Sequence, residues 1–169
     1  MKLLDTSCLI CIFSEIDFPS VLHKWIGEGY KICIPFEVFS ELQDNYKTKS
    51  KVENEIKSDK IKVLNKIEEQ KIEILKNRFP ILGKGELSVI VIAKELEDSK
   101  KKYYAVLDDK KARETAKKLQ INFTGSYGLI KALLDKKLIN QELFEQLVKK
   151  MKESNFRMIF KGNENEHRN

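Results

Sequence analysis

Short apolar runs alternate with amphipathic segments along most of this chain. Most of the runs are bounded by charged, proline or glycine residues, a pattern that favours β-strands. The predicted strands cover residues 2–4, 31–34, 71–75, 103–107 and 121–123. Strands that alternate with helices are typical of an α/β fold built on a parallel sheet.

The amphipathic segments place apolar side chains at helical spacing. The predicted helices cover residues 9–16, 19–26, 35–45, 86–96, 110–119, 125–135 and 140–153. The segment that follows Glu86 is apolar on nearly all sides, which is typical of a buried helix. A strand over residues 89–92 is the alternative for part of it.

A charged segment over residues 48–70 is interpreted as a helical insertion. Apolar residues recur there at helical intervals among Lys and Glu, and a break near Ser58-Asp59 divides it into two helices in one interpretation. Its polar face is most simply a solvated face. A nucleic-acid groove is the sharper alternative, which the interspersed acidic residues disfavour.

The 169 residues fit one domain, which we expect over residues 1–160, followed by a polar tail at 161–169. The net charge of +6 favours polyanionic partners, although a lysine-rich soluble surface explains it equally well. No apolar run approaches the roughly 18 residues of a membrane span, and no signal-peptide cleavage pattern follows the N-terminus. We therefore expect a cytoplasmic protein.

The cysteine and histidine residues do not predict a metal or redox site. Cys8 and Cys11 form a C-x-x-C within an apolar segment, and with Cys33 they make an odd number of thiols. Buried, reduced cysteines are the favoured interpretation. His23 and His167 have no ligand spacing to a partner, which disfavours zinc.

Acidic residues stand at four places that an α/β cleft could use. Asp5 follows the first predicted strand, Asp108-Asp109 follow the fourth, Glu41 lies on a helix, and Glu86 lies in the first turn of another. Each has a simpler explanation as a helix cap, a dipole partner or a solvated side chain. Carboxylates crowded in one cleft repel one another unless a cation binds between them, and oxygen ligands suit Mg²⁺ or Mn²⁺. Such a centre can hydrolyse phosphodiesters by activating a bound water.

These motifs, taken in order, resemble those of PIN-domain ribonucleases. The resemblance rests on Leu3-Leu-Asp-Thr-Ser-Cys-Leu-Ile10, Glu41 within Val-Phe-Ser-Glu-Leu, Gly83-Lys-Gly-Glu-Leu-Ser-Val-Ile90, Val106-Leu-Asp-Asp-Lys-Lys-Ala-Arg113 and Thr124-Gly-Ser-Tyr-Gly-Leu-Ile130. It covers roughly residues 1–150, and the last motif is similar to one in a prokaryotic subgroup, the VapC-like toxin branch.

The resemblance implies a PIN-like three-layer α/β/α fold with a five-stranded parallel sheet ordered 3-2-1-4-5. It implies an Mg²⁺- or Mn²⁺-dependent endoribonuclease whose metal ligands and catalytic acids are Asp5, Glu41, Glu86 and Asp108. Asp109 shares or replaces the role of Asp108, and Thr6 or Ser7 orients a ligand carboxylate or a water. The expected partners are RNA, an antitoxin protein and a second copy of the chain in a homodimer. The insertion at 48–70 departs from the family pattern, and a lid, a dimer element or an antitoxin surface are its candidate roles.

Two alternatives belong to other functional classes. A catalytically silent PIN-like module would bind RNA or a protein partner without cleaving. A phosphoacceptor receiver-type domain would use an acidic pair such as Asp108-Asp109, but receivers carry that pair after the first strand, and this hypothesis ranks lower.

Overall fold

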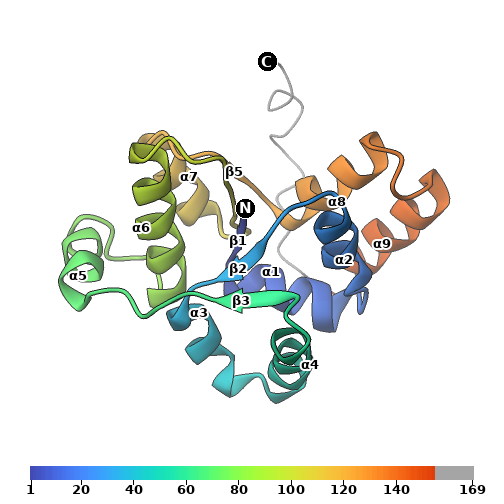
Figure 1. Ribbon diagram of the computed structural model, residues 1–169, viewed down its shortest axis with the longest axis horizontal. Coiled ribbons are helices and arrows are strands. Elements are labelled where there is room, and N and C mark those ends of the chain that lie inside the picture. The colour runs from blue at the N-terminus through green and yellow to red at the C-terminus, as the bar shows by residue number, and fades with distance from the viewer. Residues whose placement is uncertain (155–169) are drawn as a thin grey trace.

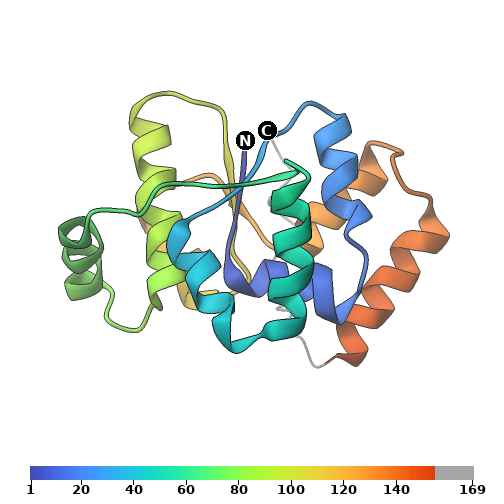
Figure 2. The same cartoon turned by 60° about the horizontal axis from the view of Figure 1, so that its bottom comes forward.

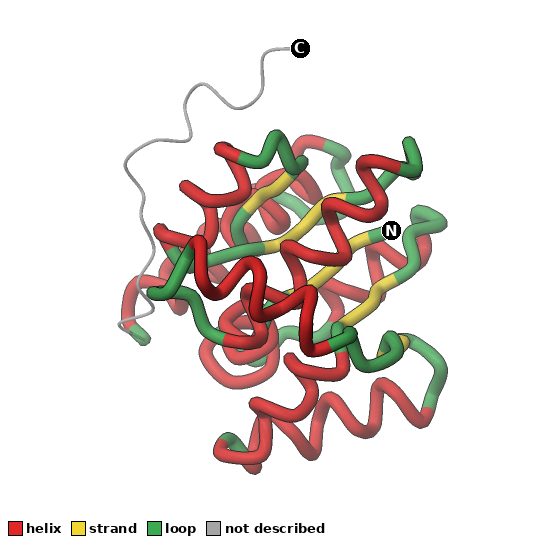
Figure 3. Tube along the Cα trace, turned by 90° about the vertical axis from the view of Figure 1, so that its left-hand side faces the viewer, coloured by secondary structure: helices red, strands yellow, loops and turns green. Residues whose placement is uncertain are grey.

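A five-stranded, all-parallel sheet forms the centre of the protein. The structure, a computed structural model, describes residues 1–154. The strands are β1 (Lys2–Leu4), β2 (Ile32–Ile34), β3 (Ile61–Val63), β4 (Tyr104–Val106) and β5 (Phe123–Thr124). They lie side by side (Figure 3), and their order is β3-β2-β1-β4-β5, which confirms the predicted order and places β1 next to β4.

Helices follow each strand and cover both faces of the sheet (Figure 1). They are α1 (Thr6–Ile10), α2 (Ser20–Gly27), α3 (Phe36–Glu41), α4 (Tyr46–Lys57), α5 (Glu69–Arg78), α6 (Lys84–Asp98), α7 (Lys110–Lys118), α8 (Ser126–Asp135) and α9 (Gln141–Glu153). A π-helical turn, Cys11–Glu15, continues α1, and a 3₁₀ turn, Leu42–Asp44, continues α3.

The two helical layers are visible on either side of the sheet in Figure 1. Helices α6 and α7 cover one face, whereas α2 and α8 cover the other and α9 packs on α8. Helix α5 lies outside this arrangement, packed against α6 (Figure 2). The PIN-like three-layer α/β/α architecture is therefore confirmed. No helix within residues 1–154 is long and apolar enough to cross a membrane.

The core is continuous from β1 into both helical layers. Leu3 and Leu4 are fully buried, and Ile90 of α6 and Ile130 of α8 are buried on the two sides of the sheet. The apolar segment after Glu86 is thus the buried helix α6, and the alternative strand over residues 89–92 is wrong.

The third strand lies at Ile61–Val63 rather than at the predicted 71–75, which belongs to α5. Residues 71–75 alternate in polarity and so mimic a strand, but Ile72 is buried whereas Ile74 is 69% exposed. A strand would direct both side chains to one face, and only helical geometry separates them. The segment 48–70 is accordingly not wholly helical, because α4 ends at Lys57 and β3 follows the predicted break.

Smaller corrections concern element ends. The first helix begins at Thr6 rather than residue 9, because Asp5 caps it. The fifth strand is Phe123–Thr124 rather than 121–123. The predicted tail at 161–169 lies outside the described residues.

Candidate functional site

Asp5 and Asp108 are neighbours because their strands pair in register. Leu4 of β1 lies opposite Val106 of β4, and each chain leaves its strand just beyond that pair. The amide N–H of Asp5 donates to the carbonyl oxygen of Val106 at 3.2 Å, and the amide N–H of Asp108 donates to Asp5 Oδ2 at 3.2 Å. The carboxyl ends of the two central strands thus bring both acids to the switch point of the sheet, where parallel α/β folds bind ligands.

Asp5 is almost fully buried, and both of its oxygens accept hydrogen bonds from the backbone. It is the N-cap of α1, where Oδ1 accepts from the amide of Cys8 at 2.7 Å. Burial raises the pKa of Asp5 well above its ordinary value, and the charges of Asp108 and Glu86 raise it further. The capping explanation is therefore correct, but it does not account for a carboxylate that its neighbours repel.

Asp108 is held by the first residue of α8. Its Oδ1 accepts from the amide of Ser126 at 2.7 Å, and its Oδ2 accepts from the Ser126 hydroxyl at 2.5 Å. A Cβ at Gly125 would lie 3.0 Å from Asp108 Oδ1, so the glycine permits this close approach. Burial raises the pKa of Asp108, although the Ser126 bonds and the nearby Arg113 oppose the rise.

Glu41 reaches from the end of α3 to the N-terminus of α6. Its Oε1 accepts from the amide of Gly85 at 2.6 Å, and its Oε2 accepts from the Thr6 hydroxyl at 2.5 Å. Any side chain at Gly85 would collide with the Glu41 carboxylate. The Thr6 hydroxyl thus contacts one of the candidate metal-binding carboxylates, while Ser7 lies half-buried in the same first turn of α1.

Glu86 lies beside Glu41 in the first turn of α6. Its Oε2 accepts from the amide of Gly83 at 2.5 Å, so it closes a capping arrangement at the positive end of the helix dipole. Burial raises the pKa of Glu86, and the charges of Asp109 and Glu41 add to the rise.

Asp109 is the N-cap of α7. Its Oδ1 accepts from the amide of Ala112 at 2.8 Å, which is the capping role expected for one member of the pair. Its charge still acts on Glu86, so Asp109 lies at the rim of the same acidic cluster.

The acids form two linked pairs rather than one closed cage. Asp5 lies with Asp108, Glu41 lies with Glu86, and Thr6 of α1 connects the pairs. Within residues 1–154, no three acidic, histidine or cysteine side chains lie close enough to enclose a metal ion. The chemistry of the donors nevertheless fits a hard divalent cation, because the cluster consists of carboxylate oxygens whose mutual repulsion a cation would relieve.

Ser126, Gly85 and Gly125 contact the candidate acids or leave room for them, and the predicted site set does not include them. Ser126 is fully buried and makes both hydrogen bonds to Asp108. The sequence indicates Ser126 through the helix start Gly125-Ser-Tyr-Gly128, because a serine in the first turn of a helix after a strand lies near the carboxyl ends of the strands.

The cysteines are buried and free, as predicted. Burial raises the pKa of the Cys8 thiol well above its ordinary value and raises that of Cys11, and the charge of Asp108 contributes to both. They pack behind the acids as neutral, small apolar side chains.

Comparison with known proteins gives the family. A family model described as a PIN domain matches residues 1–161. The chain belongs to the PIN-domain family. No curated protein and no solved structure matches it significantly. PIN domains are generally nucleases that use divalent metal ions, so membership supports a nuclease fold and an interaction with nucleic acid for this chain.

Proposed function

We propose that this PIN domain is an endoribonuclease that hydrolyses RNA phosphodiester bonds with Mg²⁺ or Mn²⁺. The observation that carries the proposal is the buried pair Asp5 and Asp108 at the switch point of the sheet, with Glu41 and Glu86 as a second pair beside it; burial raises the pKa values of Asp5, Asp108 and Glu86. Buried acids that repel one another reduce the stability of the folded protein, and a bound cation would remove that repulsion. Acids whose pKa values are strongly shifted are typical of functional sites.

Asp5, Glu41, Glu86 and Asp108 would hold the ion, with Asp109 at the rim. When bound, the ion supplies an activated water and neutralises charge on the phosphate. Ser126 keeps Asp108 in position, and Thr6 and the Gly85 amide keep Glu41 in position. Free lone pairs remain on these carboxylate oxygens after the hydrogen bonds are formed, since each oxygen has two.

The basic surface supports a polyanionic substrate around this acidic centre. The chain carries 32 Lys and Arg against 26 Asp and Glu, so the excess of positive charge lies outside the cluster of acids. Positively charged residues around the site would attract RNA, and a bound cation would offset the repulsion between the acids and the phosphate of the substrate.

The cellular role is also a proposal. On the resemblance to the VapC-like branch, we propose a cytoplasmic toxin that acts as a homodimer and is neutralised by an antitoxin protein. Within the charged segment at 48–70, α4 offers a surface for such a partner: it carries Lys49, Glu53 and Lys57 on a mixed-charge exterior.

The test is cleavage of a mixed RNA pool by the purified chain with Mn²⁺, compared with Asp5→Asn. The matched control is Asp98→Asn, which removes an exposed acid that pairs with Lys94 on the far end of α6. We expect Mn²⁺-dependent cleavage that Asp5→Asn abolishes and Asp98→Asn preserves. Full activity of Asp5→Asn, or of the native chain in excess EDTA, would contradict the proposal.

The silent-module alternative is favoured by one observation: hydrogen bonds already occupy both oxygens of Asp5, Glu41 and Asp108. It predicts that Mn²⁺ neither binds by calorimetry nor raises Tm. RNA binding without metal binding or cleavage would establish it.

A further inference from the structure

A cavity lies at the opposite end of β1 from Asp5. It has a volume of about 360 Å³ and lies between the sheet, α2 and α8. Its walls are aromatic, its polar groups are chiefly lysines, and one side of α8 closes it. The lining residues that matter are Lys2, Trp25, Tyr30, Tyr104, Phe123 and Lys136.

Lys2 is a buried cation that packs on three aromatic rings. It is 4% exposed, and its Nζ lies 3.7 Å from the ring centre of Trp25, 4.4 Å from that of Tyr30 and 5.0 Å from that of Tyr104. Within the described part of the chain, no carboxylate forms an ion pair with it. Cation–π contacts of this kind offset only part of the cost of burying an ammonium group.

Lys136, at the end of α8, adds a second positive charge to the cavity. Its ammonium pairs with Glu28 at 2.9 Å, yet its charge still acts on Lys2. Burial lowers the pKa of Lys2 to about 8, and the charge of Lys136 contributes to that shift. An anion between the two ammonium groups would relieve this repulsion.

Trp25, which also lines the cavity, has an unsatisfied polar group. Its indole Nε1 is buried and has no hydrogen-bond acceptor within the described residues. Buried donors without a partner are rare in folded proteins. The ring itself is held edge-on to Tyr30, with centroids 5.2 Å apart and planes at 86°.

The size and the walls of the cavity restrict the anion. A volume of about 360 Å³ is at the lower end of ordinary small-molecule sites. Tyr104, which is 46% exposed, and Phe123 present ring surfaces on which a planar group can stack. A simple inorganic ion would leave these aromatic walls without a partner.

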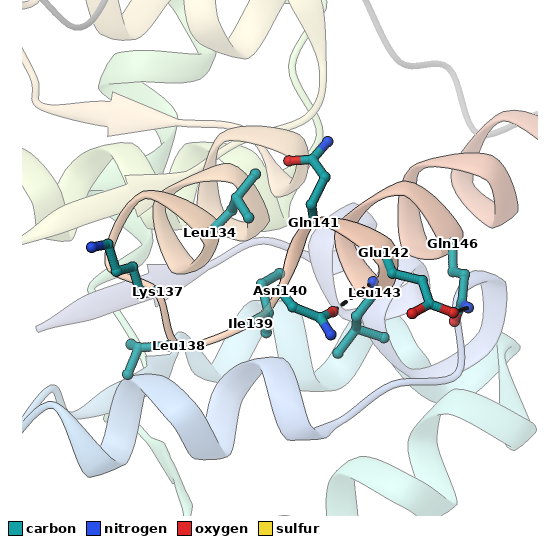
Figure 4. A pocket seen from close by; sticks show the side chains of 9 residues that line it. All are labelled: Leu134, Lys137, Leu138, Ile139, Asn140, Gln141, Glu142, Leu143 and Gln146. Carbon is teal, nitrogen blue, oxygen red and sulfur yellow. Dashed lines mark hydrogen bonds between the residues drawn. The ribbon is translucent and has the colours of Figure 1, made fainter.

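The larger hollow between α8 and α9 lacks these properties. Figure 4 shows it at the turn Lys137–Asn140, with a volume of about 720 Å³. Several of its polar side chains pair locally: Asn140 accepts from the amide of Leu143 at 2.9 Å, and Gln146 donates to Glu142 at 3.4 Å. Its lining does not bring two like-charged side chains together around one point, as Lys2 and Lys136 are brought together in the cavity at β1.

We propose that the cavity around Lys2 binds a small planar aromatic anion of the nucleoside monophosphate type. The phosphate lies between Lys2 and Lys136, and the base stacks on the aromatic wall. This site is separate from the acidic cluster and does not depend on the proposed nuclease activity.

Fluorescence of Trp25 tests the proposal directly, because the chain contains one tryptophan. The full chain is titrated with AMP at pH 7 in EDTA, which prevents binding through a metal. Adenosine and inorganic phosphate are titrated separately. We expect a saturable change in fluorescence with AMP, and binding at least about tenfold weaker for adenosine and for phosphate, because each lacks half of the contacts.

Lys2→Met should weaken AMP binding by about tenfold or more, because it removes the buried charge and keeps the side-chain volume. Lys31→Met is the matched control, since Lys31 is an exposed lysine just before β2. If Lys2→Met loses its helical circular dichroism, Lys136→Gln carries the test, with an expected weakening of several-fold. Asp5→Asn should bind AMP as well as the native chain does.

Three results would overturn the proposal. The first is no saturable change with AMP up to about 5 mM, which is weaker than a specific site of this size provides. The second is binding of adenosine or of phosphate as tight as that of AMP. Equal binding of adenosine would show that the anion is not recognised, and equal binding of phosphate would show that the ring is not recognised. The third is equal affinity in Lys31→Met and the folded Lys2 or Lys136 variant.

Discussion

The backbone N–H of Asp108 donates a hydrogen bond to the side chain of Asp5 at 3.2 Å, across 103 positions of sequence. This bond joins the end of β4 to the start of α1 and brings two carboxyl groups together in a buried place. Burial raises the pKa of both groups, so the arrangement reduces the stability of the folded protein at neutral pH. Several measurable effects follow from that cost.

Asp108→Asn should stabilise the metal-free protein while it removes metal binding. The amide oxygen can still accept from the Ser126 amide, and the amide nitrogen can donate to the Ser126 hydroxyl, so both hydrogen bonds are kept without the charge. We expect about 1 kcal/mol of added stability, or about 2–4 °C in Tm for a domain of this size. Thermal unfolding in EDTA and in Mn²⁺ measures both effects, with Asp98→Asn as control. A Tm of Asp108→Asn in EDTA below that of the native protein would show that the negative charge of Asp108 does not destabilise the metal-free protein.

The metal-free protein should lose stability as the pH rises above the ordinary carboxyl range. The pKa values of Asp5, Glu86 and Asp108 are raised in the folded state, so folded protein retains protons that unfolded protein has released. Between the ordinary values of 3.8 and 4.5 and the raised values, the free energy of unfolding therefore decreases with pH.

Urea unfolding in EDTA from about pH 4 to 7 measures this slope. Asp108→Asn should flatten it, because one of the raised groups is gone. A free energy of unfolding that instead increases across this range would mean that paired or hydrogen-bonded acids with lowered pKa values dominate the titration.

Gly85→Ala should be less stable than Gly27→Ala by about 1–2 kcal/mol, because displacing Glu41 costs its hydrogen bonds from the Gly85 amide and the Thr6 hydroxyl. The new methyl group would occupy the position of the Glu41 carboxylate and displace it from the Gly85 amide and from Thr6. Gly27→Ala is the matched control: Gly27 also lies in a helix, and nothing is within 4 Å of its added Cβ. Chemical denaturation compares the two, and equal stability of both variants would show that Glu41 moves aside without cost.

Ser126→Ala should weaken metal binding by about 10–100-fold, as the loss of an outer-sphere partner does in other metal sites. The variant removes the hydroxyl that donates to Asp108 Oδ2 and keeps the backbone bond to Oδ1. Ser58→Ala is the control, because the exposed Ser58 hydroxyl donates only to backbone carbonyls at the end of α4. Mn²⁺ titration calorimetry gives the affinities. An unchanged affinity in Ser126→Ala would exclude Ser126 as a positioning residue.

The sequence predicts the sheet and the place of the acids because both depend on local patterns. Apolar runs that stop at Asp5 and at Asp108 identify strand ends, and a parallel sheet places both at one edge, but that the two strands are neighbours was implied only by the resemblance to PIN domains. The third strand could not be found this way, since Ile61-Lys-Val63 lies within a charged segment and Ile72 and Ile74 give residues 71–75 the alternation of a strand.

Contacts between distant segments are beyond such patterns. The serine hydroxyl that holds Asp108 and the glycine amide that holds Glu41 come from helix starts 18 and 44 positions away. Nothing in the local sequence of Gly85 distinguishes a glycine required by a neighbouring carboxylate from one that only begins a helix.

The bond between Asp108 and Asp5 also determines when the acidic site can exist during synthesis. Asp5 leaves the ribosome early, but its partner follows 103 residues later, and Ser126 later still. A nascent chain that ends between residues 109 and 125 therefore contains every acid of the cluster without the serine that holds Asp108. On the proposed function, the acidic site can therefore hold a metal ion in its native arrangement only after residue 126 has been synthesised.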